Sequence, residues 1–179
     1  MRTFIALDLN EEIKDYLFEL ENELKKIFKA KIRWMNKNQI HITLKFIGEI
    51  KEEKLNEVKE ILKKINFKKF SLELNEIGFF PSKEKPAIIW VGLKNESEII
   101  NLQRKIDEEL LKLFSSEQKF SSHITLGRIK LIKDKKNFLQ VEKKHIMSKT
   151  FEVKSFSLIE SILSKDGSKY KKIESYNLV

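Results

Sequence analysis

Two copies of the tetrapeptide His-Ile-Thr-Leu, at residues 41–44 and 123–126, are the part of this sequence best suited to chemistry. They contain two of the three histidines in the chain. Side chains at positions i and i+2 of a strand share a face, so each copy places its His and Thr on one side and its Ile and Leu on the other. We therefore expect the two polar pairs to form one site: His41 with Thr43, and His123 with Thr125.

Two imidazoles and two hydroxyls can carry out acid–base chemistry at phosphorus. An imidazole titrates near ~6.5, so near neutral pH a neutral one can accept a proton while a protonated one donates a proton. In-line displacement at a phosphate needs these two groups on opposite sides of the phosphorus. The threonine hydroxyls can donate hydrogen bonds to the non-bridging oxygens. This mechanism needs no metal and no other cofactor.

Two other interpretations of the histidines compete with this one. A closed zinc site needs about four ligands and a catalytic one three, but the chain has no cysteine and no His-Glu-x-x-His spacing. The third histidine, His145, lies in a lysine-rich segment that we expect to be exposed. Both motif histidines could also be satisfied residues on sheet surfaces. The duplication of His-x-Thr favours a catalytic pair over either alternative.

The overall composition indicates a globular protein with a polyanionic partner or a lysine-rich surface. The chain has 179 residues, of which 41% are hydrophobic and 35% charged, with a net charge of +9. That size suits a single domain over residues 1–179. The positive charge fits nucleic acid, an acidic membrane, or simply a solvated surface, and charge alone leaves these open. The absence of cysteine excludes disulfides, thiolate metal sites and cysteine nucleophiles.

Nothing in the sequence predicts a membrane protein. No stretch approaches ~18 consecutive apolar residues, and the apolar run after Met1 is too short for a signal peptide. We therefore expect a monomer in the cytoplasm, with no membrane partner and no bound metal.

Hydrophobic periodicity predicts strands mixed with about four helices, an α+β fold. Strands are expected at 3–9, 32–35, 40–47, 70–74, 87–93, 122–129, 153–163 and 169–178. Helices are expected at about 11–28, 51–65, 96–114 and 135–144, with a loop at 81–86 and a hairpin turn at 165–168. The two halves are alike in outline, and each has one HITL strand. We expect two pseudo-symmetric lobes of antiparallel sheet and helices with the active-site cleft between them.

The motifs and their flanks resemble the 2H phosphoesterase superfamily, and within it the RNA 2′,3′-cyclic phosphodiesterases, also called 2′–5′ RNA ligase-like proteins. The similar segments follow in order along nearly the whole chain: Arg2-Thr3-Phe4-Ile5-Ala6, Ile32-Arg33-Trp34-Met35, His41 to Glu49, Phe79-Phe80-Pro81, Ile89 to Gly92, Phe120 to Arg128, and Leu158 to Tyr170. The sequence departs from the family at Ser122, where Pro is usual, and at Gly127, where Ala is commoner. We expect a looser approach to the second motif strand at Ser122, and Gly127 to leave room for substrate.

The resemblance implies hydrolysis of an RNA 2′,3′-cyclic phosphate to a 2′-phosphate, with RNA bearing such an end as the partner. It assigns the proton donor to His41 and the proton acceptor to His123, an assignment that the residues themselves leave open. It makes Thr43 and Thr125 phosphate-binding hydroxyls.

Three further residues are candidates for contact with substrate. Strict alternation places Lys45 on the cleft face, where it would contact phosphate or remain exposed. Arg128 matches the family pattern, but alternation turns it away from His123 unless the strand twists or bulges after Gly127. Tyr170 follows a polar turn and could stack on an unpaired base. Alternation assigns Phe46 to the core, and core packing is favoured for most of Trp34, Phe79 and Phe80.

Three alternative functions remain open at this point. The same site run in reverse would join a 2′,3′-cyclic end to a 5′-hydroxyl through a 2′–5′ bond. The substrate could instead be a cyclic nucleotide or a 2′–5′ oligoadenylate. The protein could also be an RNA-binding module in which catalysis is secondary.

Overall fold

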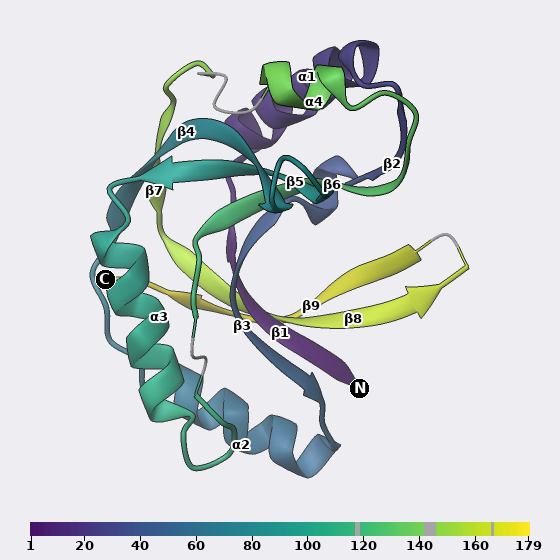
Figure 1. Ribbon diagram of the computed structural model, residues 1–179. Coiled ribbons are helices and arrows are strands. Elements are labelled where there is room, and N and C mark those ends of the chain that lie inside the picture. The colour runs from purple at the N-terminus through teal and green to yellow at the C-terminus, as the bar shows by residue number, and fades with distance from the viewer. Residues whose placement is uncertain (117–118, 142–145, 166) are drawn as a thin grey trace.

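Two antiparallel sheets define the fold of the computed structural model, which describes residues 1–116, 119–141, 146–165 and 167–179 (Figure 1). The first sheet has four strands, in the order β3 (His41–Glu49), β1 (Arg2–Asp8), β8 (Ser155–Ser164) and β9 (Gly167–Asn177). The second sheet has five, in the order β2 (Ala30–Trp34), β6 (His123–Ile132), β5 (Pro86–Lys94), β4 (Phe70–Pro81) and β7 (Thr150–Val153). Each sheet therefore holds one HITL strand.

The helices cover the outer faces of the two sheets. They are α1 (Glu11–Ile27), α2 (Glu52–Lys63), α3 (Ser97–Glu109) and α4 (Lys136–Val141), with a short 3₁₀ turn, η1 (Lys37–Gln39). Figure 1 shows α2 and α3 beside the first sheet and α1 and α4 beside the second. The side chain of Asn10 accepts a hydrogen bond from the amide of Ile13 and so caps the start of α1. One continuous apolar core contains residues of all four helices and both sheets.

The two lobes are interleaved along the chain. Strand β2 comes from the first half of the sequence but pairs with β6 in the second sheet. Strands β8 and β9 come from the end of the chain, yet β8 pairs with β1. Helix α1 follows a strand of the first sheet and packs with α4 on the second, where Phe28 stacks on Phe138 with ring centroids 4.3 Å apart. Neither lobe can therefore form from one contiguous half of the sequence.

The predicted α+β class with two antiparallel sheets is confirmed, and several element ends differ. Strand β4 continues to Pro81 instead of ending near 74, because its second half pairs with β5. Strand β7, which was not predicted, is a separate strand on the edge of the second sheet. Helix α3 ends at Glu109, five residues before the predicted end. The end of the helix predicted at 135–144, the turn residue Asp166 and His145 lie outside the described residues.

Within the described part of the chain, no helix is both long enough and apolar enough to span a membrane.

Candidate active site

Both HITL motifs line one cavity of about 490 Å³ between the two sheets. Strand β3 contributes His41 and Thr43 from the first sheet, and β6 contributes His123 and Thr125 from the second. All four side chains are half-buried, while the intervening isoleucines and Leu44 and Leu126 lie in the core. The structure thus brings the two predicted polar pairs to one cleft. Also lining it are Arg2, Thr3, Phe4, Met35, Phe46, Gly48, Phe80, Ile88, Arg128, Ser161, Ser168 and Tyr170.

Each imidazole is oriented by a hydrogen bond from its Nδ1 to the backbone carbonyl two residues earlier. Nδ1 of His41 lies 2.6 Å from the carbonyl oxygen of Gln39, and Nδ1 of His123 lies 2.8 Å from that of Ser121. A carbonyl can only accept a hydrogen bond, so Nδ1 donates in both rings and Nε2 is left to exchange protons. Nε2 of His41 lies 2.9 Å from the hydroxyl oxygen of Thr43.

Burial lowers the pKa of both histidines from the usual 6.5. For His41, the hydrogen bond to Gln39 and the carboxylate of Asp8 oppose the effect of burial, whereas the charges of His123 and Arg128 add to it. For His123, the hydrogen bond to Ser121 raises the pKa and Arg128 lowers it. The two imidazoles are therefore electrostatically coupled, and protonation of one disfavours protonation of the other.

Aromatic rings pack against each imidazole. The ring centroid of His41 lies 5.0 Å from that of Phe4 and 5.4 Å from that of Tyr170. The ring of His123 meets Phe80 edge-on, with centroids 5.0 Å apart. These contacts limit ring rotation and keep Nε2 directed toward the cleft. Phe80 is thus part of the site, whereas Phe79 is buried in the core.

Each motif strand carries a β-bulge at the leucine of its HITL sequence. Along β1, Ile5 pairs with Lys45 and Ala6 with Thr43, so Leu44 is the extra residue. Along β5, Ile89 pairs with Gly127 and Trp90 with Thr125, so Leu126 is the extra residue. A bulge places one additional residue on the strand and reverses the alternation beyond it. The side-chain directions predicted after both motifs are consequently inverted.

Lys45 therefore does not face the cleft, and its predicted orientation is wrong. Its side chain is 2% exposed, and its ammonium pairs with the carboxylate of Asp107 on α3. The same ammonium donates a hydrogen bond to the carbonyl of Ser115, with the two atoms 2.9 Å apart. Through these two contacts, Lys45 links α3 and the segment after it to the outer face of the first sheet.

The same reversal moves Phe46 and Arg128 into the cleft. Phe46, which alternation assigned to the core, is 64% exposed and lines the cavity. Arg128 reaches the cleft because β6 bulges at Leu126, before Gly127 and not after it. Gly127 instead faces β2, where a Cβ would lie 2.8 Å from Cγ2 of Ile32, so the room it leaves serves packing and not substrate. Phe46 and Arg128 occupy equivalent places, five residues after His41 and His123.

The remaining predicted residues have clear positions. Tyr170 is half-buried on β9 and lines the cleft beside His41. The hydroxyl of Ser122, at the position where the family usually has Pro, donates a hydrogen bond to Glu96. Among the residues that the structure describes, no group of three or more His, Cys, Asp or Glu is placed to hold a metal ion.

Comparison with known proteins assigns the chain to a family. The model of the family described as LigT like Phosphoesterase matches residues 7–90 and 91–170, and each matched segment contains one HITL motif. The protein belongs to this family of phosphoesterases, which confirms the resemblance predicted from the motifs.

Curated relatives support the same assignment. Proteins named RNA 2′,3′-cyclic phosphodiesterase from Archaeoglobus fulgidus and Methanocaldococcus jannaschii are 32% and 34% identical to this chain over 98% of its length, and cover 99% and 100% of their own. One of the same name from Thermotoga maritima is 36% identical, over 96% of this chain and 92% of its own.

Solved structures share the fold. TT0787 of Thermus thermophilus matches 99% of this chain and 97% of its own, with a TM-score of 0.86 and 24% identity. Escherichia coli LigT complexed with 3′-AMP matches 99% of this chain and 97% of its own, with a TM-score of 0.77 and 22% identity.

Proposed function

We propose that this protein hydrolyses RNA 2′,3′-cyclic phosphate ends to 2′-phosphates. The observation that carries the proposal is the paired His-x-Thr geometry, in which two imidazoles with directed Nε2 atoms line one cavity. A water oxygen attacks the phosphorus, the bond from phosphorus to the 3′ oxygen breaks, and the 2′ oxygen keeps the phosphate. The names of the curated relatives support the choice of substrate.

In this proposal His123 accepts the proton of the attacking water and His41 donates a proton to the departing 3′ oxygen. The resemblance of the motifs supports this assignment. Burial lowers the pKa of His41, and the carboxylate of Asp8 opposes that effect, which helps His41 to hold a proton at the start of the reaction. His123 takes up one proton and His41 releases one, so the number of protons on the two histidines together is unchanged.

The remaining polar groups stabilise the phosphate. The hydroxyls of Thr43 and Thr125 and the guanidinium of Arg128 line the cavity with the histidines. They can donate hydrogen bonds to the non-bridging oxygens as negative charge develops there. We propose that the reaction needs no metal, and that the enzyme acts as a monomer in the cytoplasm.

The direct test is product analysis with purified, chelator-treated enzyme and an oligoribonucleotide ending in a 2′,3′-cyclic phosphate. We expect a 2′-phosphate product, identified by nuclear magnetic resonance or by its chromatographic mobility. A 3′-phosphate product, or activity that returns only with added metal, would contradict the mechanism. Addition of an oligonucleotide with a 5′-hydroxyl tests the reverse joining reaction in the same assay.

The pH profile should reveal two coupled histidines. Because burial lowers both pKa values, the optimum of kcat/KM, which reports the free enzyme, is expected below about pH 6.5. Activity falls at lower pH as the accepting histidine is protonated, and at higher pH as the donating one loses its proton. The negative charge of the bound phosphate favours the protonated form of both imidazoles, so the optimum of kcat should lie at a higher pH than that of kcat/KM. An optimum of kcat/KM well above about pH 6.5, or an optimum of kcat that is no higher than that of kcat/KM, would contradict this prediction.

Phe46 provides an exposed aromatic face for the terminal base. Its ring packs against the buried ring of Phe4, with centroids 6.1 Å apart, and leaves its other side open to the cleft. Stacking of a base on an aromatic ring is worth about 1–3 kcal/mol. We expect Phe46→Ala to raise the KM for a cyclic-ended oligonucleotide about tenfold or more. Phe18→Ala, which removes a 40% exposed ring on α1, is the matched control; equal KM values for the two variants would exclude the role.

A further inference from the structure

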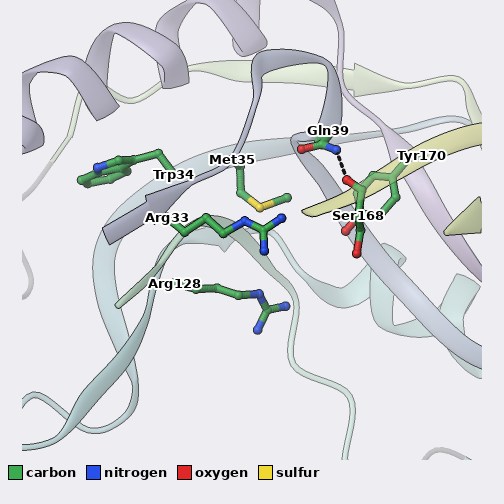
Figure 2. A pocket seen from close by; sticks show the side chains of 7 residues that line it. All are labelled: Arg33, Trp34, Met35, Gln39, Arg128, Ser168 and Tyr170. Carbon is green, nitrogen blue, oxygen red and sulfur yellow. Dashed lines mark hydrogen bonds between the residues drawn. The ribbon is translucent and has the colours of Figure 1, made fainter. Parts of the chain in front are cut away.

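A second, smaller cavity of about 90 Å³ adjoins the catalytic cleft (Figure 2). Met35, Arg128, Ser168 and Tyr170 line both cavities, so the two are connected along a shared wall. The side cavity is completed by Arg33, Trp34 and Gln39.

Two arginines stand side by side in this side cavity. Arg33 of β2 and Arg128 of β6 are directly paired across antiparallel strands, and both are exposed. Figure 2 shows both side chains extending across the cavity in the same direction. Both guanidinium groups line the cavity and can donate several hydrogen bonds to an anion bound there.

The opposite wall comes from the first sheet and is held in place by hydrogen bonding. The side-chain amide of Gln39 donates a hydrogen bond to the carbonyl of Ser168 at the start of β9. Gly167 has a φ of +122°, and any side chain there would occupy the space of the Arg33 guanidinium. Arg33 thus reaches from the second sheet to the hairpin of the first. The hydroxyls of Ser168 and Tyr170 add two donors to the lining.

The size of the side cavity suits a small group. Its volume of about 90 Å³ is well below the several hundred Å³ of pockets that hold drug-sized ligands. Its lining of guanidinium and hydroxyl donors fits a phosphate group.

We propose that the side cavity binds the phosphodiester that precedes the terminal nucleotide of the RNA. The inference rests on the proposed function, which places the cyclic phosphate between His41 and His123. The next phosphate along the strand lies one nucleotide away, and Arg128 lines both cavities and can contact either phosphate. The site therefore selects a cyclic end that belongs to an RNA strand over a free 2′,3′-cyclic mononucleotide, and Arg33 determines this preference.

The test compares two dinucleotides that both end in a 2′,3′-cyclic phosphate. One has an ordinary phosphodiester between its nucleotides, and the other has a neutral methylphosphonate at that position. For the wild type we expect kcat/KM to be about tenfold or more higher for the charged dinucleotide. Arg33→Gln should bring this ratio close to one. Arg33→Lys keeps the charge but loses the bidentate hydrogen bonding of the guanidinium group, and should give an intermediate ratio of kcat/KM values.

Arg104→Gln is the matched control, because it removes one positive charge from the exposed face of α3. It should leave the ratio at the wild-type value. A wild-type ratio near one, or an unchanged ratio in Arg33→Gln with an unaltered melting temperature, would overturn the subsite while leaving the proposed hydrolysis intact. If the wild type cleaves neither dinucleotide nor a cyclic mononucleotide, the proposed function itself fails, and the subsite fails with it.

Discussion

Alanine in place of His41 or His123 is expected to lower kcat for hydrolysis of RNA 2′,3′-cyclic ends by about 10²–10⁴-fold. Each substitution removes one of the two proton transfers, and no other imidazole is placed to take its part among the residues that the structure describes. The double variant should be little worse than either single one, because groups that act as a unit are not additive. Steady-state kinetics with one cyclic-ended oligonucleotide measures all three variants.

Two controls separate catalysis from folding and binding. His145→Ala removes the histidine that belongs to neither HITL motif and should retain wild-type kcat. Unchanged melting temperatures for the two motif variants would exclude a structural cause, and free imidazole should restore part of the activity of His123→Ala. Full activity in both motif variants would exclude the two-histidine mechanism. If the inactive variants bind RNA and still support growth in place of the wild type, the protein is an RNA-binding module in which catalysis is secondary.

Lys45→Ala is expected to lower the free energy of unfolding by about 3–5 kcal/mol. The ammonium of Lys45 and the carboxylate of Asp107 are both buried, and removal of one partner leaves the other charge inside a low-dielectric region. The measurement is denaturant unfolding followed by circular dichroism. The loss should greatly exceed that of Lys63→Ala, which disrupts only exposed ion pairs.

A second variant identifies the cause of this loss. Replacing Lys45 and Asp107 together by apolar residues removes both charges, so the double variant should recover much of the lost stability. A Lys45→Ala protein with unchanged stability but a raised KM for RNA would contradict this structural role. It would instead support the contact between Lys45 and phosphate that strand alternation predicted.

The sequence predicted which motif side chains meet in the cleft better than it predicted the residues around them. Histidine is scarce in the chain, and its repetition in two identical strand motifs was sufficient to predict that both histidines and both threonines of the motifs line the cleft. The first three helices were predictable from their apolar periodicity, although α3 ends five residues before its predicted end. Phe46 was missed because a bulge depends on the register between neighbouring strands, which no local pattern encodes. The identical spacing of Phe46 and Arg128 from their histidines was the one signal that could have linked them.

The interleaving of the sheets also governs when the cleft can form during synthesis. Strand β1 ends at Asp8, yet one of its two neighbours, β8, begins only at Ser155. The second sheet is complete once Val153 has emerged, because all five of its strands precede that point. Pairing over so long a stretch of chain is slow. All strands of the sheet that holds His123 can therefore pair on the nascent chain before β8 and β9, which complete the sheet that holds His41, have emerged.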